Sequence, residues 1–164
     1  MKYNILRNKS IVKIREYLST IDNVKILPPK EFNSKYLRTI DGCIEAINYI
    51  GDCYLHGDSI EADYRKAFRL FYLSAMAGDS YGILQLGFMT FYGLGTKKDF
   101  TKAIGYYKES SSLGNIYAKY NLGLCYMDGT GVVRDYETAY NYFISAYRRG
   151  HFMSMYQIAQ IYHL

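Results

Sequence analysis

The sequence predicts an all-α fold, an α/α superhelix (solenoid) of antiparallel helix pairs, and two observations carry this prediction. Glycine, aspartate and alanine recur every 36 residues through most of the chain, and a fixed period of this length is typical of stacked repeats. Each 36-residue unit also contains two apolar helical segments joined by a short link with glycine. One helix pair cannot bury enough apolar surface alone, so at least three pairs must stack. We expect about nine helices in a right-handed superhelix.

The repeat is carried by five columns of residues that keep one register along the chain. Such agreement is hard to produce by chance, and it defines the unit before any single motif is considered. The columns are Gly51, Gly87 and Gly123; Gly57, Gly93 and Gly129; Asp63, Asp99 and Asp135; Ala67, Ala103 and Ala139; and Gly78, Gly114 and Gly150.

Each element of a unit has a local reason, shown best by the second unit. A first helix is expected over 81–92, with Gly93 just past its end, where a left-handed conformation costs glycine no Cβ clash. Asp99 then precedes the second helix and can cap its free N–H groups. Gly114 closes that helix and Asn115 can cap the next one. The stretch YGLGTKK at 92–98 is similar to a phosphate-binding loop, but it follows a helix and lacks the required spacing.

The glycines inside the first helices need another explanation, because glycine there costs roughly 1 kcal/mol relative to alanine. Recurrence of Gly51, Gly87 and Gly123 predicts a second helix that approaches too closely for a Cβ atom. We expect the alanine column to provide the close partner, with bulky residues filling the surrounding space. These fillers are Leu70-Phe71, Tyr106-Tyr107 and Tyr142-Phe143.

The most complete copy of the pattern runs from Ala118 to Asp135 and reads AKYNLGLCYMDGTGVVRD. It resembles the Sel-one-like repeat, a subtype of the tetratricopeptide helical repeat. The resemblance divides one solenoid domain into a divergent N-terminal repeat over 1–43 and three clear repeats over 44–79, 80–115 and 116–151. A first helix without its partner follows over 152–164. Its uncovered flank predicts that the chain is a fragment or that this end meets another molecule, such as a second copy.

The resemblance also implies a concave groove, lined by one side of the first helices, that binds a partner polypeptide. At about 100° per residue, that side is aromatic and apolar in the middle units and acidic in unit one. Tyr, Phe and Met are enriched in the cores of interfaces, although such residues could instead pack between helices. The predicted partner-binding residues are Tyr81, Leu84, Phe88, Phe91, Tyr117, Tyr120, Leu124, Met127 and Tyr156.

Composition excludes several other classes of protein. Residues 1–43 hold nine Lys/Arg and four Asp/Glu, whereas residues 44–164 hold eleven of each; the body is neutral, so we expect no nucleic acid partner. No apolar run reaches the ~20 residues of a membrane helix, and no secretory signal is recognisable. Cys43, Cys53 and Cys125 form no CxxC pair, so we expect buried free thiols in a cytoplasmic protein.

No residue pattern points to catalysis, a cofactor or a metal. The three histidines are not paired at helical spacing, the aspartates are periodic like caps, and Ser110 lies in a small-residue column without a visible base. We therefore expect a protein-protein interaction scaffold or adaptor, with a host-directed effector of a bacterium or virus as one version. The alternative is a β-lactam-binding or β-lactam-hydrolysing enzyme, which the family resemblance implies because some secreted, cysteine-rich members have been linked to that activity. Those members carry regularly paired cysteines, and this chain does not.

Overall fold

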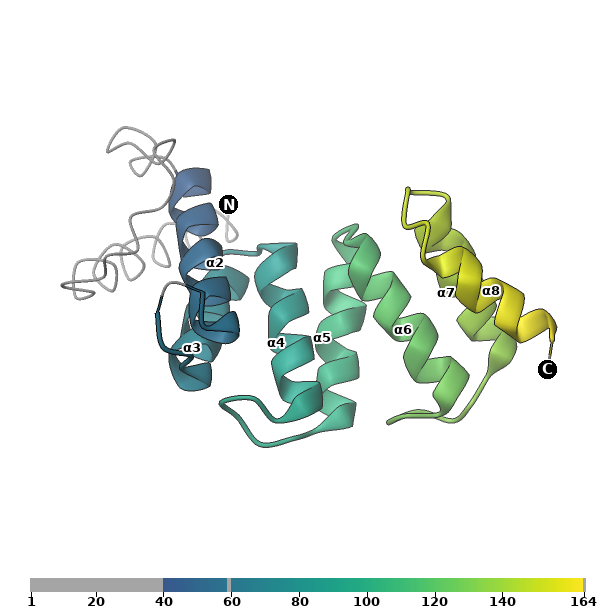
Figure 1. Cartoon of the computed structure of the whole chain (residues 1–164). Helices are drawn as coiled ribbons and strands as arrows, with labels where there is room; N and C mark the ends of the chain where they lie inside the picture. The colour runs from purple at the N-terminus through teal and green to yellow at the C-terminus, as the bar shows by residue number, and fades with distance from the viewer. Residues whose placement is uncertain (1–39, 59, 164) are drawn as a thin grey trace.

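The computed structural model describes residues 40–58 and 60–163, with side chains from Ile44 onward, as a stack of helices without strands. The all-α prediction is confirmed. Seven of the expected nine helices fall within this part of the chain, and the rest of the prediction concerns residues 1–39, outside it. α2 and α8 lie at opposite ends of the array (Figure 1). The helices are α2 (Ile40–His56), α3 (Tyr64–Met76), α4 (Ser80–Tyr92), α5 (Phe100–Ser112), α6 (Ile116–Asp128), α7 (Tyr136–Tyr147) and α8 (Ser154–Tyr162).

The predicted capping residues lie at the ends and at the starts of these helices. Gly93 and Gly129 follow α4 and α6 in the left-handed conformation, with φ of 76° and 71°. The Asp99 carboxylate accepts a hydrogen bond from the backbone N–H of Lys102 at the start of α5, and Asn115 caps α6 in the same way. Residues 93–99 thus connect two helices, as expected, and the YGLGTKK stretch does not form a phosphate-binding loop.

The close approach at the helical glycines is real, but the predicted partner was wrong. A Cβ atom built on Gly123 would lie 2.5 Å from the ring of Phe143, and one on Gly87 would lie 2.6 Å from the ring of Tyr107. Phe71 stands in the same relation to Gly51, at 2.8 Å. The glycines therefore make room for a buried aromatic ring of the second helix, not for the alanine column.

Neighbouring units share buried contacts because each second helix packs on two first helices. Leu84 of α4 shares one buried cluster with Ile104 of α5 and Leu122 of α6. The small-residue column is fully buried at Ser74 and Ser110, and the Ser110 hydroxyl donates to the Ser80 carbonyl oxygen at 2.7 Å. Packing therefore explains the serine, as expected.

The links also contact the neighbouring unit. Gly131, in the link between α6 and α7, has φ of +73°, and a Cβ atom there would lie 2.7 Å from Phe100 Cβ and 2.8 Å from Ile104 Cδ1 of α5. Gly95 meets the backbone of Tyr64 at the start of α3 in the equivalent way. Each of these two links therefore presses against the second helix of the unit before it.

Candidate functional site: two repeated pockets between the first helices

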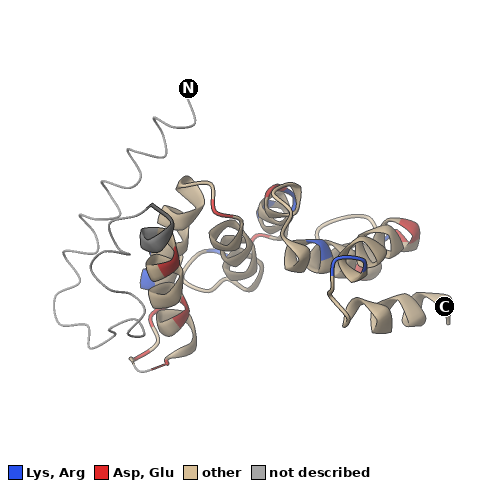
Figure 2. Ribbon diagram, turned by 90° about the horizontal axis from the view of Figure 1, so that it is seen from above, with Lys and Arg blue, Asp and Glu red and all other residues tan. Residues whose placement is uncertain are grey.

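The interface between α2 and α4 is polar. The Tyr81 hydroxyl donates to the Asp52 carboxylate at 2.9 Å and accepts from Gln85 Nε2 at 2.7 Å. The Asp79 carboxylate accepts from Asn48 Nδ2 at 2.8 Å and also caps α4. Burial raises the pKa of Asp52 above its usual range, against the opposing effect of the Tyr81 hydrogen bond. Acidic residues gather around α2 and α3 at this end of the array (Figure 2).

The interface between α4 and α6 is apolar and leaves a pocket. We call it the α4/α6 pocket; its volume is about 400 Å³. Aromatic rings form its wall, since the Phe91 ring lies 4.8 Å from that of Phe100 and 5.1 Å from that of Tyr92. Polar side chains complete the lining, among them Lys98, Asn121 and Thr130, and a mixed lining of this kind can hold an apolar group and orient it through polar contacts. The lining residues are Phe88, Phe91, Tyr92, Lys98, Phe100, Tyr107, Asn121, Leu124, Cys125, Asp128 and Thr130.

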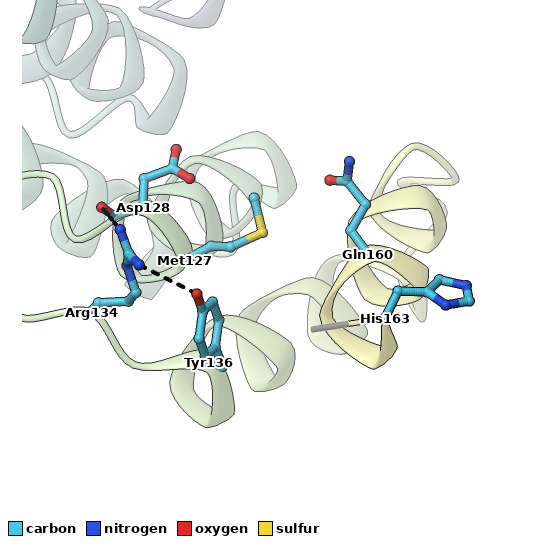
Figure 3. A pocket seen from close by; sticks show the side chains of 6 residues that line it. All are labelled: Met127, Asp128, Arg134, Tyr136, Gln160 and His163. Atoms are coloured by element: carbon cyan, nitrogen blue, oxygen red, sulfur yellow. Dashed lines mark hydrogen bonds between the residues drawn. The ribbon is translucent and has the colours of Figure 1, made fainter.

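A second pocket lies between α6 and α8, and we call it the α6/α8 pocket. Its volume is about 460 Å³, and it is lined by Met127, Asp128, Arg134, Tyr136, Gln160 and His163. In Figure 3 the Arg134 guanidinium lies between the Tyr136 hydroxyl and the backbone oxygen of Asp128, and it donates to both at 3.5 Å. Gln160 of α8 and His163, which directly follows α8, lie on the opposite side. This pocket is more polar than the first.

The two pockets are the same site in successive units. Five of the six residues that line the α6/α8 pocket stand 36 positions after residues that line the α4/α6 pocket. The shared columns are Phe91 and Met127, Tyr92 and Asp128, Lys98 and Arg134, Phe100 and Tyr136, and Leu124 and Gln160. The repeat therefore builds a row of pockets at the link end of the first helices, with a different lining in each unit.

The predicted groove residues divide into four groups. Phe88, Phe91, Leu124 and Met127 line the two pockets. Tyr117 and Tyr156 are more than half exposed but line neither, whereas Leu84 is 7% exposed and belongs to the core because α6 packs against it. Tyr81 and Tyr120 are half-buried between helices: Tyr81 binds Asp52, and the Tyr120 ring lies 4.5 Å from His151.

The sequence analysis did not predict the pocket-lining residues that come from the links and the second helices. Lys98 and Arg134 lie near the ends of the links, and Phe100 and Tyr136 begin α5 and α7. Inspection of first helices alone could not find them. The signal was nevertheless present, because a cation followed two residues later by an aromatic residue recurs at a spacing of 36.

The described part of the chain holds no group of His, Cys, Asp and Glu side chains arranged for a metal ion. Burial raises the pKa of the Cys125 thiol to about 11, and Cys53 is buried as well; both are free, as expected, while the side chain of Cys43 lies outside the described residues. A buried thiol with a raised pKa is a poor nucleophile at neutral pH. Among the described helices, none is both long and apolar enough to cross a membrane.

Comparison with protein families gives a match that covers most of the chain. The model of the Sel1 repeat matches residues 44–79, 80–115 and 116–151. The chain belongs to the Sel1 repeat family. The resemblance deduced from the Ala118–Asp135 motif is confirmed.

Solved structures of other Sel1 repeat proteins have the same fold. A Sel1 repeat protein from Oxalobacter formigenes is 25% identical, with a TM-score of 0.70 over 98% of this chain and 59% of its own. The antigen c5321 of uropathogenic Escherichia coli, described as protective and as having an SLR fold, is 26% identical, with a TM-score of 0.68 over 74% of this chain and 26% of its own.

A third similar structure is cysteine rich protein B of Helicobacter pylori, 24% identical with a TM-score of 0.57. It shows the fold alone. The chain spans about three fifths and about a quarter of the first two relatives. A comparison with curated proteins gives no match.

Proposed function

We propose that this Sel1 repeat chain is a protein-interaction scaffold that binds a partner polypeptide through the row of pockets at the link end of its first helices, without catalysis of its own. One observation carries the proposal: the α4/α6 pocket combines an aromatic wall with access from solvent, and Tyr92 on its rim is 57% exposed. Apolar pockets of this kind hold the anchoring side chains that dominate binding energy in interfaces.

The chemistry of the pocket favours a polypeptide over a reacting small molecule. Its one buried thiol, Cys125, has a raised pKa, and Lys98 lies over the Phe100 ring at 4.7 Å, on the rim of the pocket. No pair of acid and base within hydrogen-bond reach, as catalysis of proton transfer needs, is found among its described lining residues. The β-lactam alternative therefore has no observation in its favour, and failure of the purified chain to hydrolyse nitrocefin is the expected result.

Affinity capture with two matched variants tests the scaffold proposal. Tyr92→Ser with Tyr117→Ser alters a rim residue of the α4/α6 pocket and a predicted groove residue; both are more than half exposed, so the fold should persist. The control carries Tyr72→Ser with Leu113→Ser, which are similarly exposed on or next to second helices and line neither pocket. Proteins retained by the wild type and the control but not by the first variant support the proposal. Identical capture by all three overturns it.

We also propose self-association through α8. Its support is the row of exposed apolar side chains at the start of that helix, where Phe152 is 76% exposed and Tyr156 62% exposed, because clusters of this kind usually mark an interaction site. Light scattering should show a mass above that of the monomer at high concentration, and Phe152→Ser with Tyr156→Ser should restore the monomer. A strict monomer in the wild type contradicts this part of the proposal.

The cytoplasm is the proposed compartment, supported by the free thiols Cys53 and Cys125, since free cysteines are usual where thiols are kept reduced. Nucleic acid is not a proposed partner, because residues 44–164 have equal numbers of cationic and acidic residues. Filter binding should therefore give no salt-sensitive retention of single strands.

A further inference from the structure

The two repeated pockets carry a cation at the same place. Lys98 Nζ lies 4.7 Å from the centroid of the Phe100 ring, and the Arg134 guanidinium lies 6.0 Å from that of Tyr136. A cation held over an aromatic face is positioned before any ligand arrives. In unit one the equivalent position is Ala62, so units two and three have a cation at this position and unit one does not.

These cations keep their capacity to bind an anion. In the described part of the chain neither Lys98 nor Arg134 forms an ion pair, and the hydrogen bonds of Arg134 go to two neutral acceptors. The nearby carboxylate of Asp135 accepts the N–H and the hydroxyl of Thr138 at the start of α7. Asp99 is likewise a helix cap. Among the described residues that line either pocket, Asp128 is the one acidic side chain, and it lines both.

We propose that the occupant of this row is an extended acidic segment of a partner protein, with an aromatic or aliphatic side chain in the α4/α6 pocket and a carboxylate against Arg134 in the α6/α8 pocket. This inference rests on the proposed scaffold function and names the partner's chemistry. The apolar wall of the first pocket selects the anchor. Arg134 selects the carboxylate, because a guanidinium presents a fork of donors that matches a carboxylate.

The separation of the two groups follows from the repeat. Equivalent points in successive units are one to two helix-packing distances apart, about 10 to 20 Å. An extended chain covers this distance with about three to six residues at about 3.3 Å per residue. The links 93–99 and 129–135 lie along the same lower edge of the array in Figure 1, so a segment that follows this edge would pass both pockets.

The proposal predicts that Asp128 opposes binding of the acidic segment, whereas Arg134 supports it. Asp128 lines both pockets, and its negative charge would repel an acidic segment bound across them. Removing this charge should therefore tighten binding, whereas removing the charge of Arg134 should weaken it. A surface that merely holds apolar side chains would show neither effect.

The test uses the full chain and short labelled peptides, followed by fluorescence polarisation at low and at physiological salt. The probe peptides have one Phe and one Glu in a Ser/Gly background, separated by about three to six residues. Matched peptides carry Lys in place of Glu or Ser in place of Phe. The protein variants are Arg134→Glu, Asp128→Asn and, as a charge-matched control outside both pockets, Arg148→Glu.

We expect one Phe–Glu spacing to bind the wild type at least about tenfold more tightly than either matched peptide, a difference of about 1.4 kcal/mol. Arg134→Glu should reverse the preference toward the Phe–Lys peptide, Asp128→Asn should tighten Phe–Glu binding, and Arg148→Glu should change nothing. Equal binding of the Glu and Lys peptides by the wild type overturns the inference, as does an unchanged preference in Arg134→Glu. If Arg134→Glu still captures the partners that the Tyr92/Tyr117 variant loses, the scaffold function stands and this inference fails.

Discussion

Replacement of Gly123 by alanine tests the packing that holds each helix pair together. The new Cβ atom would lie 2.5, 2.7 and 2.8 Å from three atoms of the Phe143 ring, and that ring is fully buried, so it has no free space to enter. Overpacking of this kind costs about 1 to 3 kcal/mol, and three contacts below 3.0 Å favour the upper end. Alanine regains about 1 kcal/mol of helix propensity, so we expect a net loss of about 2 kcal/mol.

A matched substitution should have the opposite sign. Gly105 is exposed in α5, and a Cβ atom there meets nothing within 4 Å. Gly105→Ala should therefore stabilise the chain by about 0.5 to 1 kcal/mol. The glycine-to-alanine change thus separates helix propensity from steric fit, because Gly123 faces an aromatic ring and Gly105 does not.

Urea denaturation followed by helical circular dichroism measures both variants, and thermal melting supports it. For a chain of this size 1 kcal/mol corresponds to about 2 to 4 °C, so Gly123→Ala should melt about 4 to 8 °C lower. Adding Phe143→Leu to Gly123→Ala should cost less than Phe143→Leu alone costs the wild type, with a coupling of about 1 kcal/mol or more. A Gly123→Ala variant as stable as the wild type would refute the reasoning.

Four further results are expected. Thr90→Val should stabilise the chain by about 1 kcal/mol in urea denaturation, because the Thr90 hydroxyl is buried without a hydrogen-bond partner; lower stability would show that this hydroxyl is satisfied. Asp99→Ala should cost about 1 kcal/mol through loss of the α5 cap, while Asp99→Asn should cost less; equal losses would contradict the capping role. Burial raises the pKa of Asp52 in the folded chain. The stabilisation that comes from its protonated form is therefore fully present below the unfolded pKa of about 3.9, and it is lost as pH rises through the folded pKa. Asp52→Asn should therefore lose less stability than the wild type in melting curves from pH 3 to 7, and parallel curves would count against this. Peptide-level mass spectrometry after iodoacetamide treatment at pH 8 should find Cys125 alkylated only in denaturant, since its pKa is about 11 and it is buried; labelling in the native chain would assign it an open environment.

The periodic residues of the sequence predict the fold and its caps because they obey local rules. Gly93 and Asp99 occupy the conformations that a helix end and a helix start require, whatever surrounds them. The partner of Gly123 is a tertiary property. A column shows that something approaches closely, but both Ala139 and Phe143 recur with the same period, and the sequence cannot say which one faces the glycine.

The candidate site was predictable only where it lies on the first helices. The predicted side of α4 and α6 supplies Phe88, Phe91 and Leu124 to the α4/α6 pocket. Leu84 lies on the same predicted side, yet it is buried, because how closely α6 approaches α4 is set by packing that a single helix does not reveal. Lys98 and Arg134 were missed because their positions depend on how each link returns to its second helix.

Gly131 bears on how such arrays can change. Surface connections between helices usually accept insertions with little effect, but this one abuts Phe100 of the preceding unit and has no room for a side chain. It acts as a spacer between neighbours: a longer or bulkier connection would tilt every later unit and so alter the pitch of the whole spiral. Variation of the residues that line the pockets is therefore compatible with the packing, while the length of this connection is constrained by geometry.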